Sequence, residues 1–514
     1  MCQGAAPGGG LAGALPRRRV LIWLWLFAAG FAALYVSLAD YVEIPWVDGV
    51  CTADSAINLV TKGEWRSYAW NYTYQPLYGL LLAGWVWLFG VSHAVTCSLG
   101  VCLYALSFVY IGAAMSRCGW LSSPRGLCVW VVLFWVVWAP WWVCACRIDS
   151  LTLLAASVVV RLLLSGGGGE RGTALFLSAV ALMLSSLYAV PLVAVFVAFL
   201  FAVDYGGVGR MAWLRRGAAV AAGFCVGLAL TCLFYFLNDF LLHYLGAPQT
   251  AAATSVSWNP FIKMVSLNFG LVLNGEDALL RLVHAYTSEP MAIVLLAVAW
   301  GFAMRIGRWR LLLGFVSLIP LLMTLFGRYT FSYSWVFSIP TMVCLVALSA
   351  EGGFVRLATP LRVGLCAVLL SVPEGFRYWV NYLKNTPSRW EQNERTGDFV
   401  RSQSATLAKF DNIIATDPVA YYPLTALGKR LYMFQYDNIE VPSSVCGCVP
   451  LNQWLSAMGY KEYQPDDCLP DSGVLVVTPY DRRRHVAEYR LSQKPFATDT
   501  LASDGGFLLV AFKL

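Results

Sequence analysis

The amino-acid sequence predicts a polytopic α-helical membrane protein that carries a soluble α/β domain at its C-terminal end. Hydrophobic residues make up 59% of the 514 residues and charged residues only 13%, about half the charged fraction of an average soluble domain. Several uncharged runs are longer than the roughly 18 residues that a membrane span needs. Because backbone polar groups in lipid must be satisfied within the segment itself, these runs predict helices.

The N-terminal run Val20–Ala39 follows the basic triplet Arg17-Arg18-Arg19. The run is longer than the apolar part of a secretory signal peptide, which favours an uncleaved first span over the alternative of a cleaved leader. Basic residues in short loops favour the cytoplasmic side. The triplet therefore predicts a cytoplasmic N-terminus and a first outer loop over residues 40–93.

The apolar run Pro76–Ser92 is the ambiguous segment of the transmembrane part. If it crossed the membrane, Arg117 and Arg125 would lie outside. If it lies in the outer interface, both arginines are cytoplasmic, as the charge rule requires. This second arrangement predicts eleven spans, in a range of 11–13, within residues 1–373. After Val20–Ala39 the spans are Ala94–Met115, Leu127–Cys146, Ser150–Ser165, a hairpin over Thr173–Val203, Gly217–Leu237, Pro290–Met304, Leu311–Gly327, Tyr329–Ala350 and Val363–Pro373, with a large outer loop over residues 238–289.

The composition becomes that of a soluble protein from Glu374 onward, and residues 374–514 have the size of an ordinary domain. The last predicted span runs outward, so this domain is expected on the outer face. The predicted strands are Asn412–Thr416, Arg430–Gln435, Gly473–Thr478 and Phe507–Lys513, and the predicted helices are Val419–Leu427, Leu451–Gly459 and Arg483–Leu491. The candidate disulfide cysteines are Cys446, Cys448 and Cys468, with Cys51 as a further candidate.

Four ionisable residues from distant parts of the chain meet at the outer surface in this topology. They are Asp48, Arg147, Asp149 and Arg328. Ionisable side chains at membrane depth are costly and are therefore candidates for function. A carboxylate at a low-dielectric interface suits general-base catalysis, which makes Asp48 the candidate base. The structural alternatives are a cap for a helix over Thr52–Lys62, a salt bridge between Arg147 and Asp149, and an interfacial anchor at Arg328.

Several function classes have no support in the sequence. No phosphate-binding loop, dinucleotide-binding glycine pattern or zinc-protease motif is present. The net charge of +7 lies largely in short loops, so it indicates topology and no nucleic-acid partner. With four His in the chain, a His-rich metal site is not predicted. No cofactor is certain, and Asp48, Asp149 and His243 are the candidate ligands of a divalent cation.

The first outer loop resembles that of the GT-C glycosyltransferases, in particular the branch of the protein O-mannosyltransferases and the bacterial aminoarabinose transferases of lipid A. The family pattern begins Asp-Glu and ends Gly-Asp-Trp, and this chain has Asp48-Gly49 and Gly63-Glu64-Trp65. Gly49 thus replaces the second acid, and Tyr74-Gln75 replaces an acidic-basic pair of many relatives. Further segments that resemble the family, in the same order, are Gln75-Pro76-Leu77-Tyr78 with Trp87-Leu88-Phe89-Gly90, then Arg147-Ile148-Asp149, and Gly327-Arg328-Tyr329 followed by Pro340.

The resemblance implies an integral membrane glycosyltransferase of a bacterial inner (plasma) membrane. Such an enzyme moves a sugar from a polyprenyl-phosphate donor to a lipid, glycan or protein acceptor at the outer face. The resemblance implies catalytic roles for Asp48 and Asp149. The residues implied in binding the donor phosphate and sugar are Arg328, Tyr329, Arg147, Tyr74, Gln75 and Tyr78.

Two other classes remain as alternatives. A lipid or sugar transporter, or a flippase, predicts charges deep within spans and internal repeats, and the sequence shows neither. A membrane scaffold without enzymatic activity would use the C-terminal domain to bind a partner. The expected partners of the favoured class are membrane lipids and a polyprenyl-phosphate-linked sugar.

Overall fold

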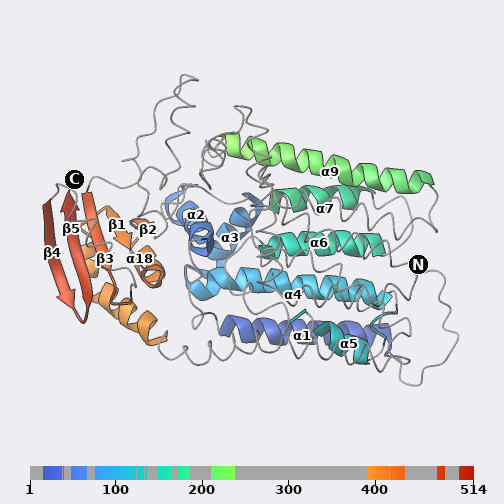
Figure 1. Cartoon of the computed structure of the whole chain (residues 1–514), viewed down its shortest axis with the longest axis horizontal. Helices are drawn as coiled ribbons and strands as arrows, with labels where there is room; N and C mark the ends of the chain where they lie inside the picture. Colours follow the sequence, from blue (N-terminus) through green and yellow to red (C-terminus); the bar gives the residue numbers. More distant parts are fainter. Residues whose placement is uncertain are drawn as a thin grey trace, which may run out of the picture.

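The computed structural model describes an array of helices with a small α/β domain at one end (Figure 1). The described residues are 15–37, 39, 48–65, 76–117, 119–122, 124–131, 134–135, 149–164, 172–185, 210–237, 390–415, 417–433, 472–480 and 497–513. The helices of the N-terminal half are α1 (Arg17–Ser37), α2 (Asp48–Lys62), α3 (Pro76–Phe89), α4 (His93–Arg117), α5 (Pro124–Val131), α6 (Asp149–Leu164), α7 (Gly172–Ser185) and α9 (Arg210–Leu237). The predicted outer loop 238–289 and the four predicted spans after it lie outside the described residues.

Three helices within the described residues are long and apolar enough to cross a membrane. They are α1, α4 and the segment Leu214–Thr231 of α9. The chain is therefore a helical membrane protein, as the composition predicts. In α4 the charged Arg117 ends the helix, and in α9 the helix extends past Arg215 and Arg216, which the hydropathy-based boundary had excluded.

α1 and α4 lie against each other in opposite directions. Gly112, near the end of α4, packs against Leu24 in the first half of α1. α5 and the residues just after it then return along α4. Trp130 of α5 stacks on Phe108 at 5.6 Å between ring centroids, and Phe134 lies 4.4 Å from the ring of Tyr104, one turn nearer the start of α4. These directions agree with a first span that runs outward, α4 inward and the next segment outward again.

α6 and α7 continue this alternation. Leu151, in the first turn of α6, shares an apolar cluster with Leu99 near the start of α4. α6 therefore runs in the same direction as α4. Ser185, the last residue of α7, donates a hydrogen bond to Thr152 Oγ1 in the first turn of α6 at 3.1 Å. α7 therefore runs opposite to α6, as the predicted crossings require.

α7 and α9 are parallel neighbours that approach closely through two glycines. A Cβ atom on Gly223 would lie 2.4 Å from the Phe176 carbonyl oxygen, and one on Gly227 would lie 2.6 Å from the Met183 Cβ. Later residues of α9 contact later residues of α7, so the two helices run in the same direction. Small residues four positions apart allow helix backbones in a membrane to approach in this way.

α2 and α3 lie across one end of the array, next to the α/β domain (Figure 1). We call this end the cap end. With 14 residues, α3 is about 21 Å long, which is shorter than the roughly 30 Å hydrocarbon core of a bilayer. Trp87, Leu88 and Phe89 at its end are all exposed, Trp87 by 73%. Length and placement agree with the prediction that this segment does not cross the membrane.

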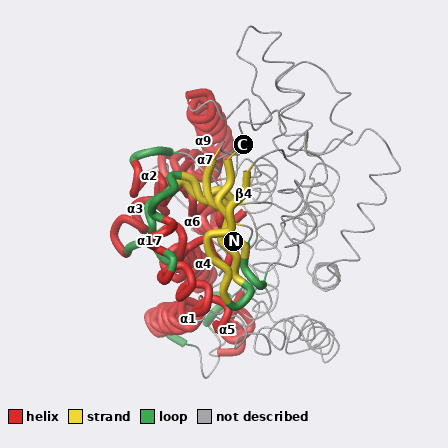
Figure 2. The backbone as a smooth tube through the Cα atoms, turned by 90° about the vertical axis from the view of Figure 1, so that its left-hand side faces the viewer, coloured by secondary structure: helices red, strands yellow, loops and turns green. Residues whose placement is uncertain are grey.

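The C-terminal domain contains a five-stranded mixed sheet in the order β2-β1-β3-β5-β4. β2, β1 and β3 are parallel, and β5 pairs antiparallel with β3 and β4. The strands are β1 (Asn412–Ala415), β2 (Arg430–Met433), β3 (Ser472–Val477), β4 (Ala497–Asp504) and β5 (Phe507–Lys513). In Figure 2 the strands stand in front of the helices of the array, which lie behind them.

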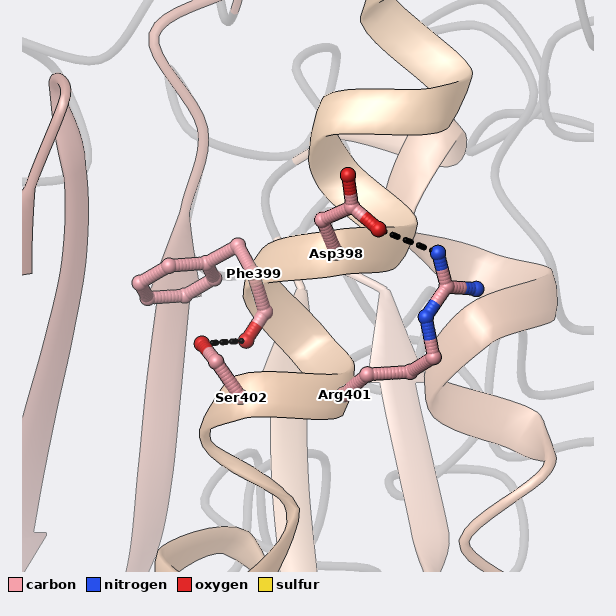
Figure 3. A network of polar contacts seen from close by, with 4 residues as sticks. All are labelled: Asp398, Phe399, Arg401 and Ser402. Carbon is pink, nitrogen blue, oxygen red and sulfur yellow. Dashed lines mark hydrogen bonds and ion pairs between the residues drawn. The ribbon is translucent and has the colours of Figure 1, made fainter.

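A helix over residues 390–402 packs on one face of this sheet. Phe399 stacks on Phe507 of β5 at 4.7 Å between ring centroids. On the other side of the same helix, Asp398 and Arg401 form an exposed ion pair. Figure 3 shows the two sides, with the Ser402 hydroxyl hydrogen-bonded to the Phe399 carbonyl. This division into an apolar and a charged side is that of a surface helix.

Four of the five strands agree with the prediction from the sequence, and β4 was not predicted. Its sequence, ATDTLASD, is rich in polar residues because it is the edge strand of the sheet. Gly505 and Gly506 connect β4 to β5 with φ values of +54° and +86°. A Gly-Gly pair before an apolar run is a hairpin signal that would have identified this strand.

The predicted helix Val419–Leu427 is present in a shorter form. It comprises the 3₁₀ turn η7 (Pro418–Ala420), the helix α18 (Tyr421–Thr425) and a following turn. A further short helix, α17 (Ser404–Leu407), precedes β1. The predicted boundary at residue 374, the predicted helices Leu451–Gly459 and Arg483–Leu491, and Cys446, Cys448 and Cys468 lie outside the described residues.

Candidate functional site

The predicted helix of the first outer loop is α2, and it begins at Asp48, four residues before the expected start. It ends at Lys62 because Gly63 adopts a φ of +71°, a left-handed conformation that glycine accepts without strain. The Gly63 amide donates to the Leu59 carbonyl at 3.1 Å and completes the last turn. The glycine of the Gly63-Glu64-Trp65 motif is therefore a helix terminator.

Trp65, the last residue of this motif, attaches the loop to two other helices. A Cβ atom on Gly79 of α3 would lie 2.8 Å from the Trp65 ring, so the glycine makes room for the indole. The ring also meets Phe234 of α9 edge-on, at 5.8 Å between centroids. The motif thus fixes where the end of α2 lies relative to α3 and α9.

The two predicted catalytic carboxylates each occupy the first position of a helix. Asp48 begins α2 and Asp149 begins α6. A helix N-terminus carries partial positive charge and favours a negatively charged group nearby. Ala53 of α2 and Leu151 of α6 belong to one apolar cluster at the cap end, so both helices contribute residues to it. The catalytic roles themselves stay predictions.

Tyr78 is the described member of the predicted donor-binding set, and its side chain is fully buried. It belongs to the apolar cluster at the cap end, next to Leu82 and Val86 of α3. Its position is therefore that of a packing residue, and contact with a donor stays a prediction. Arg328, Tyr329, Arg147, Tyr74, Gln75 and His243 lie outside the described residues. Among the described side chains, no group of three or more His, Cys, Asp and Glu could hold a metal ion.

Asp54 is a buried carboxylate of α2 that the sequence-based site did not include. Its side chain is 2% exposed, and Oδ1 accepts a hydrogen bond of 2.9 Å from the Tyr421 hydroxyl of α18. Burial first, and then the Asp54 carboxylate, raise the pKa of Tyr421 well above its usual value. The phenol therefore keeps its proton and remains a donor over the whole physiological pH range.

A signal for Asp54 exists in the sequence of α2. Asp54 lies three residues before Ile57 and next to Ala53, both of which are fully buried. Residues three or four apart share one face of a helix. A carboxylate on the buried face of an amphipathic helix needs a polar partner, although the pattern does not say which residue supplies it.

Lys62, in the last turn of α2, makes a second contact with the C-terminal domain. Its Nζ donates to the Asn58 Oδ1 at 2.9 Å and to the Lys429 backbone carbonyl at 2.8 Å. Burial lowers the pKa of Lys62, while the charges of Asp54 and Glu64 oppose that shift. The ammonium group of Lys62 thus connects α2 to the residue that precedes β2.

A third contact joins the C-terminal domain to the start of α4. The hydroxyl groups of Tyr422 and Thr96 are 2.6 Å apart, and either can donate. The Tyr422 ring also lies 5.3 Å from the His93 ring. Together with the apolar cluster, which extends from α2 and α3 to Leu424 and Val474, these contacts make the cap end one continuous unit.

Comparison with known proteins supports the fold. No family model matches the sequence, and no curated protein sequence matches it. The structure is similar to the crystal structure of ArnT from Cupriavidus metallidurans bound to undecaprenyl phosphate, with a TM-score of 0.58, 15% identity, and coverage of 95% of this chain and 98% of that chain. The apo state of the same protein gives a TM-score of 0.51, 15% identity, and coverage of 95% and 97%. The fold expected from the resemblance to the GT-C glycosyltransferases is thereby confirmed, and this chain has the ArnT fold over nearly its whole length.

Proposed function

We propose that this protein is an integral membrane glycosyltransferase that uses a polyprenyl-phosphate-linked sugar as donor. The observation that carries the proposal is the fold shared with ArnT, a GT-C lipid A aminoarabinose transferase. The similarity includes both the helical array and the C-terminal domain, and that ArnT structure holds undecaprenyl phosphate. A transporter or flippase is less well supported, because its expected charges deep within spans are lacking from the predicted segments.

The proposed reaction exchanges one bond for another at the anomeric carbon of the sugar. An acceptor hydroxyl of a lipid, glycan or protein attacks that carbon, the bond to the donor phosphate breaks, and the polyprenyl phosphate leaves with the bonding electrons. Asp48 takes the proton of the attacking hydroxyl as general base. Asp149 orients the acceptor at the start of α6.

The leaving phosphate needs a cation to stabilise its charge. Arg328 is proposed for this role, since a guanidinium group binds phosphate through two parallel hydrogen bonds. Arg147, Tyr329, Tyr74 and Gln75 are proposed to bind the remaining phosphate and sugar oxygens, and Tyr78 belongs to the apolar cluster. The site is proposed to face outward at the inner membrane of a bacterium, with the N-terminus in the cytoplasm.

The transfer reaction is tested with the full-length protein in lipid nanodiscs. Lipid that copurifies with the protein is identified by mass spectrometry, and a panel of polyprenyl-phosphate sugars is then offered as donors. We expect a polyprenyl phosphate or its glycosylated form to copurify, and free polyprenyl phosphate to accumulate when donor and a crude envelope acceptor are present. In sealed liposomes that contain the protein, movement of an intact donor across the bilayer without release of polyprenyl phosphate would instead establish a flippase.

Sidedness is tested with two engineered cysteines and a membrane-impermeant maleimide on intact cells. The first substitution, Arg117→Cys, lies at the end of α4 away from the cap end. The second, Ala405→Cys, lies in α17 of the C-terminal domain. Both positions are exposed. We expect labelling above the parent protein at position 405 and labelling at position 117 only after the cells are permeabilised. The reverse pattern would place the proposed site in the cytoplasm.

A further inference from the structure

The C-terminal domain touches the helix that begins with the candidate base through buried polar contacts. Asp54 is six residues after Asp48, which is about 9 Å along α2 at the usual helical rise. Its carboxylate is 2% exposed and accepts the Tyr421 hydrogen bond. A buried carboxylate is stable only when hydrogen bonds replace its lost hydration. The Tyr421 hydrogen bond therefore favours the position of α2 in which Asp54 reaches the phenol.

Two further hydrogen bonds attach the C-terminal domain to the helical array, one at α2 and one at α4. Lys62 donates to the Lys429 carbonyl eight residues after Asp54, so α2 is attached near its middle and at its end. Tyr422, the neighbour of Tyr421, contacts Thr96 and His93 in the first turn of α4. α18 thus bridges α2 and α4 through adjacent tyrosines. Attachment at separate points restrains rotation of α2 about its axis as well as translation, which a single bond would not do.

We propose that Tyr421 is a positioning residue, which holds α2 through Asp54 so that Asp48 at the start of the helix is placed for the transfer reaction. This inference rests on the proposed function. Tyr421 belongs to a domain that starts more than 300 residues after α2 in the sequence, and its hydroxyl acts on Asp48 through the helix backbone. In this scheme the C-terminal domain contributes to the placement of the candidate base.

The test compares Tyr421→Phe with Tyr480→Phe in the full-length protein. Both changes remove one phenol oxygen from the C-terminal domain, but the ring contacts of Tyr480 are with Phe507 and Arg395 of that same domain. Two properties are measured: hydrogen exchange of the backbone amides of α2, and the kcat and donor KM of transfer. For Tyr421→Phe we expect faster exchange in α2 and a kcat lowered by roughly tenfold or more, since small misplacements of a catalytic group have effects of this size. Donor KM should stay within about twofold, because a fall in kcat at constant KM is typical of interactions lost only in the transition state. Tyr480→Phe should change neither the exchange of α2, nor kcat, nor KM.

A conservative variant distinguishes loss of the position of α2 from failure of the protein to fold. Asp54→Asn keeps an oxygen that can accept the Tyr421 bond, so it should retain most of the kcat and the slow exchange of α2. If Tyr421→Phe alone does not fold, because it leaves a buried carboxylate without that donor, the combined Asp54→Asn and Tyr421→Phe variant removes the buried charge. The combined variant should fold and show the same loss of kcat.

The outcomes distinguish this inference from the proposed function. Unchanged exchange in α2 of a folded Tyr421→Phe variant would overturn the inference, even if transfer is demonstrated. Faster exchange with an unchanged kcat would also overturn it. Faster exchange in a protein whose wild-type form transfers no sugar from any polyprenyl-phosphate donor would reject the proposed function and leave the attachment of α2 by Tyr421 established.

Discussion

Replacement of Asp48 by Asn is expected to lower sugar transfer by about 10²- to 10⁴-fold, which is the usual contribution of a general base. Asp48 is the first residue of α2. Asn has nearly the size of Asp and keeps one of its two side-chain oxygens, so the helix should form normally. The variant thus removes the proton acceptor with the smallest change of shape.

The rate is measured with saturating donor, next to the thermal unfolding of the same preparation. Asp398→Asn is the control, since it removes an exposed carboxylate from the helix over residues 390–402 (Figure 3). It should leave the rate unchanged. Transfer by Asp48→Asn at more than half the wild-type rate would exclude Asp48 as the base. A rate that falls only together with the unfolding temperature would assign Asp48 a structural role.

Replacement of Gly223 by Ala is expected to destabilise the helical array by about 1–3 kcal/mol, the usual cost of an added methyl group in a filled core. The new Cβ would meet the carbonyl oxygen of Phe176 at 2.4 Å and the Cβ of Ala179 at 2.8 Å. Backbone atoms cannot move aside as a flexible side chain can. α7 and α9 must therefore separate, and their remaining contacts are weakened as well.

Gly217→Ala provides a matched control in the same helix. No atom outside the local backbone lies within 4 Å of a Cβ placed at Gly217, and Ala has a higher helix propensity than Gly by roughly 1 kcal/mol. Thermal unfolding in one detergent should therefore show a lower midpoint for Gly223→Ala and an equal or higher midpoint for Gly217→Ala. Equal midpoints for both variants would contradict the close packing of α7 and α9.

The sequence predicted the helical elements well because a single requirement dominates them. A span needs an uncharged run, and the runs at Val20–Ala39, Ala94–Met115 and Ser150–Ser165 correspond to α1, α4 and α6. The charge rule gave their relative directions, which the contacts between the helices confirm. Helix ends were predicted less well where a helix continues beyond the apolar run, as α9 does toward Arg210.

The candidate site was predicted only in part. The topology and the resemblance selected Asp48 and Asp149, whose catalytic roles stay predictions, but neither gave a reason to select Asp54. The partner of Asp54 is 367 residues away, and no local pattern encodes a contact of that separation. Tyr421 itself is one of 25 tyrosines, and its neighbours in the sequence do not distinguish it. Such residues are found only when the folded chain brings the two segments together.

The separation between Asp54 and Tyr421 also has a consequence for biogenesis. At about 5–20 residues per second, the ribosome reaches Tyr421 roughly 20 to 70 s after Asp54, given the 367 residues between them. During that interval the first loop has entered its compartment while its carboxylate still lacks this donor. α2 can make this bond only after the chain has been made as far as Tyr421, so the first loop acquires its final arrangement late in synthesis.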